Sequence, residues 1–343
     1  MNRCSSVGRR PARGRRALLL AAAAFGVGGP LAVPASAQQA RGGGGGDRAT
    51  GPVNAVATVG MVADAVRAVG GERARVETLI GEGVDPHLHR PTRADTAKML
   101  GAEALFAVGH RLEGRMGDVL DRVRASGRSV TLLAETLPRE RLRAWDEYPD
   151  AADPHVWMDP ALWADASASV ATALSRLRPA HAAEFAANHA AYRERLLRLD
   201  AYAREALGTV PESGRLLVTA HDAFSYFGAR YGLEIASIQG LSTDSEASLA
   251  QIEALVAKLV ARRVPAVFAE TSVPDRAVRA LIEGAGARGH RVALGGNLFS
   301  DAMGPAGTYE GTLEGMLDHN ATVIARALGG RVPDRGLNGR LAA

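Results

Sequence analysis

An uninterrupted stretch at residues 179–207 is the sequence feature that most constrains the fold. Pro179 suits the start of a helix and Gly208 its end, and neither glycine nor proline stands between them. A single helix of about 28 residues would be about 42 Å long, which exceeds an ordinary crossover between strands. We therefore predict a rigid linking helix at 179–208; two ordinary helices with a short break are the alternative. Apolar or aromatic residues recur along the stretch at Phe185, Tyr192, Leu196, Leu199 and Tyr202.

Short apolar runs alternate with helical patterns on both sides of this stretch. Before it, the pattern predicts strands at 56–59, 76–80, 104–108 and 130–133 and helices at 61–69 and 92–100. After it, the pattern predicts strands at 216–219, 235–238, 267–269 and 292–294 and helices at 224–231 and 249–261. This alternation implies parallel sheets covered by helices on both faces. We predict an α/β protein with two doubly wound parallel-sheet lobes joined by the linking helix: an N-terminal lobe at 52–178, a C-terminal lobe at 209–330 and a tail at 331–343.

The first 37 residues have the composition of a secretory signal peptide. Residues 1–16 carry six arginines and no acid, an apolar run at 17–33 follows, and Ala35-Ser36-Ala37 forms a small-x-small cleavage site. Glycines and a proline at 28–30 interrupt the run, which disfavours the alternative of an uncleaved membrane anchor. We predict an extracytoplasmic, periplasmic protein with no membrane span after signal removal. The Arg15-Arg16 pair leaves both the Sec and the twin-arginine export routes open.

Signal removal changes the charge and the cysteine content. The six arginines leave without any acid, so the formal charge changes from +4 to −2, and a basic pI is no argument for nucleic-acid binding. The only cysteine, Cys4, leaves as well, which excludes disulfides and thiolate metal sites. Residues 38–51 contain five consecutive glycines and are predicted to form a flexible tether. Any metal would have to be held by imidazole and carboxylate groups.

Histidines recur in one local setting. The tripeptides Asp85-Pro86-His87 and Asp153-Pro154-His155 are identical, and proline stiffens the backbone before each imidazole. His221 directly follows the predicted strand 216–219, and Asp301 comes after another predicted strand. The carboxyl ends of parallel strands line the binding crevice of α/β sheets. Each histidine alone could equally have a surface or capping role, and no compact metal motif is present. The residues by themselves therefore leave two interpretations open: a histidine-rich metal site, or histidines with structural roles only.

The order of these motifs resembles the metal-binding solute-binding proteins of zinc and manganese ABC importers, the TroA-like or cluster A-I family. The resemblance runs from about Val56 to Ala327 and covers nearly the whole exported chain. The motifs that carry it are Gly83-Val84-Asp85-Pro86-His87, Asp153-Pro154-His155-Val156-Trp157-Met158-Asp159-Pro160, Thr219-Ala220-His221-Asp222-Ala223-Phe224 and Ser300-Asp301-Ala302-Met303-Gly304.

The resemblance implies a metal site in the cleft between two lobes. His87 and His155 would come from the N-terminal lobe, and His221 and Asp301 from the C-terminal lobe. It implies one divalent ion per chain, delivery to an ABC importer permease in the membrane, and a monomer that is no enzyme. Zinc is favoured over manganese because family members that favour manganese or iron often carry Glu where this chain has His221. Residues 112–154 contain no histidine, so the His-rich loop of many zinc receptors is absent, and manganese stays a real alternative.

Carboxylates beside the predicted ligands are candidates to orient the imidazoles. A ligating imidazole usually donates its other N–H to a carboxylate or carbonyl, and the candidates here are Asp85, Asp153, Asp222 and Glu270. For Asp85 and Asp153, turn formation with the following proline is an equal alternative. The role of His89 is open. The other histidines are interpreted as structural and the tryptophans as packing residues: His110, His181, His189, His290, His319, Trp145, Trp157 and Trp163.

Two other functions fit parts of the pattern. A secreted zinc hydrolase would use three protein ligands and a general base, with Asp301 as that base instead of a ligand and Glu270 in support. A surface adhesin is a label that some members of the resembled family carry, but no adhesive surface is evident from the sequence.

Overall fold

The computed structural model describes residues 51–342. The predicted signal peptide at 1–37, and the predicted tether except for its last residue, lie outside the described residues. Among residues 51–342, no helix is both long enough and apolar enough to cross a bilayer.

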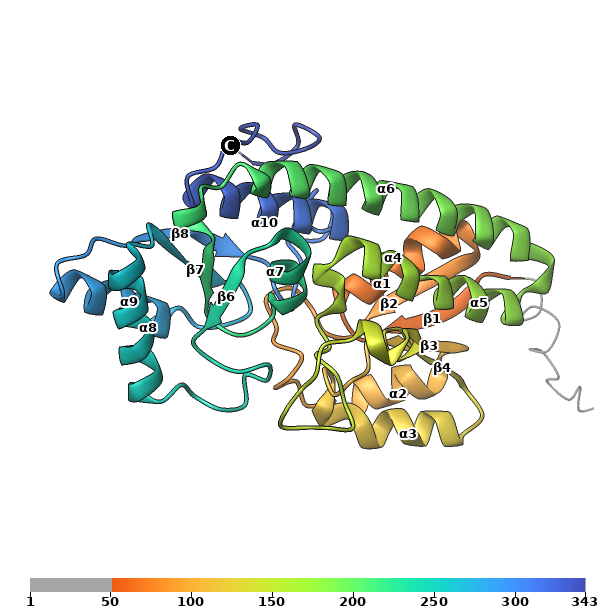
Figure 1. Ribbon diagram of the computed structural model, residues 1–343. Coiled ribbons are helices and arrows are strands. Elements are labelled where there is room, and N and C mark those ends of the chain that lie inside the picture. The colour runs from red at the N-terminus through yellow and green to blue at the C-terminus, as the bar shows by residue number, and fades with distance from the viewer. Residues whose placement is uncertain (1–50, 343) are drawn as a thin grey trace, which may run out of the picture. The chain divides into compact units, whose positions relative to one another are not determined.

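The N-terminal lobe is built on one parallel sheet with the strand order β2-β1-β3-β4 (Figure 1). The central strands β1 and β3 are almost wholly buried, whereas the edge strands β2 and β4 are half-buried. The chain leaves β1 in one direction for β2 and then crosses to β3 and β4 on the other side. Right-handed crossovers therefore place α1 on one face and α2 and α3 on the other. The bounds are β1 Val53–Ala57, α1 Gly60–Gly70, β2 Ala74–Thr78, α2 Arg93–Gly101, β3 Ala104–Ala107, α3 Gly117–Ala125, β4 Ser129–Leu132, α4 Pro160–Ala166 and α5 Ala168–Leu177.

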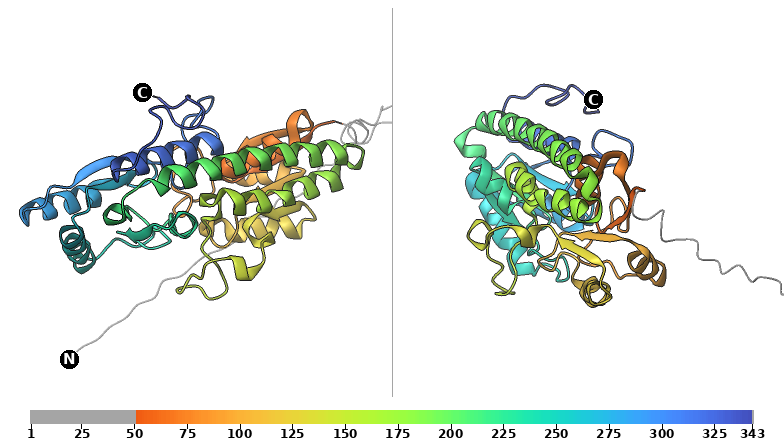
Figure 2. Two further views of the ribbon diagram at one scale, coloured as in Figure 1. Left: turned by 45° about the horizontal axis from the view of Figure 1, so that its top comes forward. Right: turned by 90° about the vertical axis from the view of Figure 1, so that its right-hand side faces the viewer.

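The predicted linking helix is confirmed as one continuous element. A 3₁₀ turn at Pro179–His181 leads into α6, which runs over Ala182–Gly208 without a break. Its buried residues follow the spacing of one helical face and include Phe185, Tyr192, Leu196 and Leu199. This face packs on α1, α4, α5 and the last helix, α10 (Leu313–Ala327), and Figure 2 shows α6 passing from the helices of the N-terminal lobe to α10. The two lobes thus share the hydrophobic core that lies under α6.

Truncating a buried residue of α6 is expected to destabilise the protein strongly. Leu199 is fully buried in the shared core, so Leu199→Ala should lower the free energy of unfolding by about 2–5 kcal/mol. The neighbouring Arg198 has a side chain that is 58% exposed, and Arg198→Ala should change that free energy by less than about 0.5 kcal/mol. Urea denaturation of the metal-free variants measures both values. Equal effects at the two positions would contradict the packing described for α6.

The C-terminal lobe carries its parallel strands as two pairs. β5 pairs with β6 and β7 pairs with β8, and within the described residues no ladder joins the pairs into the single sheet expected from the sequence. A second apolar core forms between these strands and helices α8 and α9. The bounds are β5 Leu216–Thr219, α7 Ser225–Tyr231, β6 Glu234–Ser237, α8 Leu249–Arg262, β7 Ala266–Glu270, α9 Arg276–Ala287, β8 Ala293–Leu298 and α10 Leu313–Ala327.

The last strand is longer than the sequence pattern predicts. Glycines at 295 and 296 indicate a strand end, yet β8 continues through both to Leu298. A Cβ on Gly295 would lie 2.6 Å from the ring of Phe268 on β7, and Gly296 has a φ of +147°. The two glycines therefore allow the strand to pass close to the Phe268 ring. This extension brings the chain to Asp301, three residues beyond the strand.

Candidate metal centre

Four side chains from four separate loops meet at one buried point. His87 lies in the loop after β2, His155 precedes the 3₁₀ turn at Val156–Met158, His221 follows β5, and Asp301 follows β8. One donor atom from each residue lies within 4.8 Å of the donor atoms of the others. All four residues are buried, none more than 3% exposed. The structure thus brings together the four predicted ligands and no other His, Cys, Asp or Glu of the described residues joins this group.

The cluster centres on the carboxylate of Asp301. Its Oδ2 lies 3.1 Å from Nε2 of His221 and 3.6 Å from Nε2 of His87, and its Oδ1 lies 3.3 Å from Nε2 of His155. Neither carboxylate oxygen has a hydrogen-bond partner. A buried carboxylate without a hydrogen bond is costly, and in the metal-free protein only the positive charge of His221 and His155 offsets that cost. A bound cation would take over this role.

The spacing of the imidazoles suits a small transition-metal ion. Two nitrogen ligands of a tetrahedral zinc ion lie about 3.3 Å apart when each bond is about 2.0–2.1 Å. Nε2 of His87 and Nε2 of His155 are 3.4 Å apart. The donor set of three imidazoles and one carboxylate therefore fits such an ion in both chemistry and size.

The two Asp-Pro-His tripeptides form the same local turn. Oδ1 of Asp85 accepts the backbone N–H of His87 at 2.8 Å, and Oδ1 of Asp153 accepts the backbone N–H of His155 at 3.0 Å. These turns over proline aim each imidazole inward. Only Asp153 also contacts the ring, where it accepts the Nδ1–H of His155 at 2.7 Å. The turn interpretation thus describes Asp85, whereas Asp153 combines both roles.

Glu270 orients the third imidazole from a neighbouring strand. At the end of β7, Glu270 accepts the backbone N–H of His221 at 2.8 Å and its Nδ1–H at 2.5 Å. An ionised carboxylate can only accept, so Nδ1 carries a proton and Nε2 is the ring nitrogen that binds a metal once its own proton is displaced. Asp222 instead accepts from the hydroxyl of Ser225 and makes no hydrogen bond to an imidazole. Of the four candidate carboxylates, Asp153 and Glu270 therefore contact imidazole rings, and Asp85 and Asp222 do not.

Burial and neighbouring charges set the protonation of the cluster. Burial lowers the pKa of His87 to about 3. Burial also opposes protonation of His155, but the carboxylates of Asp153 and Asp301 outweigh it and raise the pKa of His155 to about 9. Burial would raise the pKa of Asp301, yet His221 and His155 hold it well below its ordinary value. The carboxylates of Glu270 and Asp301 likewise outweigh burial and raise the pKa of His221 well above its ordinary value. Asp301 is therefore ionised, and an entering metal ion must displace the protons of His155 and His221.

Two aromatic residues tie the loops of the cluster together across the lobes. The indole N–H of Trp157 donates to the backbone oxygen of Ser300 at 3.0 Å, and the hydroxyl of Tyr226 donates to the backbone oxygen of Asp153 at 3.0 Å. The sequence interpretation of Trp157 as a packing residue missed this contact. The signal available was its position two residues after His155, beside the predicted ligand loop.

The remaining histidines lie away from the cluster. Nε2 of His89 lies 3.6 Å from a carboxylate oxygen of Asp95 on α2, so its ring does not face the four donors. His110 occupies a turn of positive φ next to Glu135, which accepts its backbone N–H. The others contact nearby carboxylate or carbonyl oxygens, as structural residues do: His181 with Glu184, His189 with Ala164, His290 with Val264 and His319 with Asn297.

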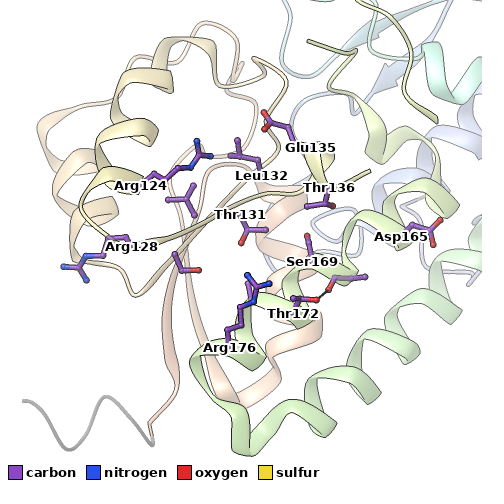
Figure 3. Close-up of a pocket in the computed structure, with 14 residues that line it drawn as sticks. Arg124, Arg128, Thr131, Leu132, Glu135, Thr136, Asp165, Ser169, Thr172 and Arg176 are labelled. Atoms are coloured by element: carbon purple, nitrogen blue, oxygen red, sulfur yellow. Dashed lines mark hydrogen bonds between the residues drawn. The ribbon is translucent and has the colours of Figure 1, made fainter. Parts of the chain in front are cut away.

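A larger cavity of about 750 Å³ lies elsewhere, beside β4 (Figure 3). Arg124, Arg128 and Arg176 are among its lining residues, and none of the four clustered donors is. Glu135 and Asp165 also line it, but no histidine does and its residues form no group of converging metal donors, so the buried cluster is the candidate metal site.

Fold and cluster together define a class: a two-lobed α/β binding protein with a His₃Asp centre between its lobes. Comparison with known proteins gives the family. Residues 55–327 match the family described as "Zinc-uptake complex component A periplasmic", ZnuA. The chain belongs to this family of metal-binding receptors of ABC importers.

Two curated relatives and a solved structure agree with this assignment. The chain is 42% identical to the manganese-binding lipoprotein MntA of Bacillus subtilis over 79% of this chain and 88% of that protein. It is 43% identical to the zinc-binding protein TroA of Treponema pallidum over 80% and 88%. The structure of the latter superimposes with a TM-score of 0.78 and covers 81% of this chain and 99% of that chain. These relatives are binding proteins, and the comparisons lend no support to a secreted hydrolase.

Proposed function

We propose that this protein captures one divalent transition-metal ion outside the cytoplasm through His87, His155, His221 and Asp301 and delivers it to an ABC importer permease. The observation that carries the ligand assignment is the Asp301 carboxylate, whose two buried oxygens face three imidazole nitrogens and have no hydrogen-bond partner. With neutral imidazoles and an ionised Asp301, the site and a divalent ion together carry a charge of about +1, which is far less costly to bury than the bare ion.

Binding would couple the two lobes. We place the lobes at 52–178 and 209–330, on either side of the linking helix at 179–208, so that each lobe supplies two ligands. A bound ion then cross-links the lobes, and release requires the bonds from one lobe to weaken. All four donors come from one chain, which supports a monomeric receptor. The arginine-rich signal supports periplasmic export, by the Sec or the twin-arginine route.

A binding role rather than catalysis follows from the position of Asp301. A catalytic zinc keeps an open position for water, with a base nearby. Asp301 lies within 3.6 Å of all three Nε2 atoms, where a fourth ligand would lie, and Glu270 is engaged by His221. We therefore propose that the protein is not an enzyme.

Zinc is the proposed ion, although the two relatives are named for different metals. The three imidazole nitrogens favour zinc, and the Irving–Williams order places zinc above manganese at any such site. A manganese ion would need both oxygens of Asp301 to reach its preferred higher coordination, and these oxygens are divided between His155 on one side and His87 and His221 on the other. Both oxygens face the cluster, so the choice of zinc rests on the nitrogen-rich donor set.

Titration of the metal-stripped protein tests this proposal. Calorimetry should show one Zn²⁺ ion per chain, and in competition zinc should bind at least about 100-fold more tightly than manganese, as expected for a nitrogen-rich site. Elemental analysis of protein purified from its own periplasm shows which metal is carried in the cell. Absence of binding by both ions would overturn the proposed function, whereas tighter binding of manganese would overturn only the choice of metal.

A further inference from the structure

A small cavity connects the metal centre with the protein surface. It has a volume of about 210 Å³, and His87 is the only one of the four clustered donors that lines it. The other lining residues come from both lobes and are largely polar, aromatic or charged: Arg111, Gly114, Arg115, Trp145, Tyr148, Ser242 and Asp244. A hydrated cation loses its water more easily along such a wall than along an apolar one.

An ion pair between Arg115 and Asp244 spans this cavity. Arg115 belongs to a 3₁₀ turn of the N-terminal lobe, at Gly114–Met116, and Asp244 belongs to the loop between β6 and α8 of the C-terminal lobe. The two side chains are 34% and 47% exposed, so the pair sits at the outer end of the cavity, whereas His87 is buried at its inner end.

The residue before Asp244 makes a second contact between the lobes. The hydroxyl of Thr243 donates to Oδ2 of Asp85 at 2.5 Å, and Asp85 forms the turn that aims His87. Consecutive residues of one loop therefore hold both the outer end of the cavity and the ligand loop at its inner end. When this loop moves away, both contacts between the lobes open together.

A second cavity, of about 330 Å³, reaches the cluster from the side of Asp301. Much of its wall is apolar or glycine, including Ile80, Ala302 and Met303. Glu82 joins its two sides by accepting the backbone N–H of Ala306. Its lining also includes the carboxylates of Glu82 and Asp301, but within the described residues no ion pair joins its two sides. This second cavity is the alternative route for the metal ion against which the first is tested.

We propose that the cavity over His87 is the passage by which the metal ion enters and leaves, and that the Arg115–Asp244 ion pair is a latch that holds this passage closed. The proposal rests on the proposed metal-binding function. In the closed protein Arg115 neutralises Asp244. When the lobes part, Arg115 moves away with its own lobe, and the Asp244 carboxylate attracts the incoming cation, which later passes to the imidazole of His87. The other arginine of the lining, Arg111, is paired with Asp150.

The latch predicts a specific pattern of rates. Arg115→Gln and Asp244→Asn should each speed release of Zn²⁺ by about two- to fivefold, the size of effect that a partly exposed ion pair supports. The double variant should release no faster than either single variant, because each change removes the same contact. Only Asp244→Asn should also slow Zn²⁺ association, since only that variant removes the carboxylate at the mouth.

Stopped-flow mixing of the zinc-loaded full chain with excess chelator measures release, and mixing of metal-free protein with Zn²⁺ measures association. Arg124→Gln removes an exposed ion pair with Asp121 inside the N-terminal lobe and should leave both rates unchanged. Glu82→Gln tests the second cavity. Wild-type release rates in both latch variants, or faster release in Glu82→Gln alone, would overturn the latch. Failure of the wild-type protein to bind zinc would instead overturn the proposed function.

Discussion

Asp301→Ala is expected to lower the affinity for Zn²⁺ by at least about 100-fold, because loss of a charged ligand should exceed the 10- to 100-fold cost of losing a supporting residue. Asp301 supplies the only negative charge within the cluster and contacts each of the three imidazoles within 3.6 Å. The fold should survive, since neither carboxylate oxygen takes part in a hydrogen bond that the variant would break.

Thermal denaturation with and without metal checks the Asp301 prediction independently of calorimetry. At a zinc concentration about 100 times the wild-type dissociation constant, the wild-type protein should gain about 2.7 kcal/mol of stability and the variant less than about 0.5 kcal/mol. His155→Ala should likewise reduce the stability that the protein gains from zinc. Wild-type affinity in either variant would refute the assignment of that residue as a ligand.

Glu270→Gln is expected to have the next largest effect and to weaken zinc binding about 10- to 100-fold. Glu270 accepts two N–H groups of His221, one from the backbone and one from the ring. The amide of glutamine has one accepting oxygen and no charge, so the ring loses a charge-assisted hydrogen bond that sets its tautomer and orientation.

Asp222→Asn is the matched control for Glu270→Gln. Asp222 is adjacent to His221 in the chain, but its carboxylate bonds to Ser225 instead of an imidazole. Zinc affinity should therefore stay within about twofold of wild type, since the substitution lies outside the contacts to the ligands. Equal losses in the two variants would show that neighbouring negative charge, and not the contact with the ring, supports His221. Circular dichroism of the metal-free proteins checks that both variants fold.

The parts of this structure that can be predicted from the sequence are those that depend on interactions between residues close together in the chain. The repeated Asp-Pro-His tripeptides form the same turn because proline and the preceding carboxylate act within three residues. The linking helix is readable because its apolar spacing continues without a breaker from Ala182 to Gly208. The end of β8 is misjudged because glycine usually stops a strand, and only the Phe268 ring beside Gly295 explains why it does not here.

The supporting contacts of the site are decided by packing between distant segments. Glu270 and His221 are 49 residues apart, and Trp157 and Ser300 are 143 residues apart, so no local pattern pairs them. From the sequence, Asp222 was as good a candidate as Glu270 to accept the ring N–H of His221. In the folded chain β5 lies beside β7, and this places Glu270 against the ring. Burial also determines the charge balance of the site. Because water is excluded, the Asp301 carboxylate has no hydrogen-bond partner and only positively charged groups can offset its charge.

By itself, the sequence determined the alternating α/β pattern, the linking helix and the stiff turns that carry His87 and His155, because each of these depends on neighbours in the chain. The tertiary structure alone decided that four donors from two lobes converge within 4.8 Å, which carboxylates hold the imidazoles, and that an ion pair closes the cavity over His87. These features depend on how the two lobes pack against α6 and each other, and that packing is a property of the folded chain as a whole.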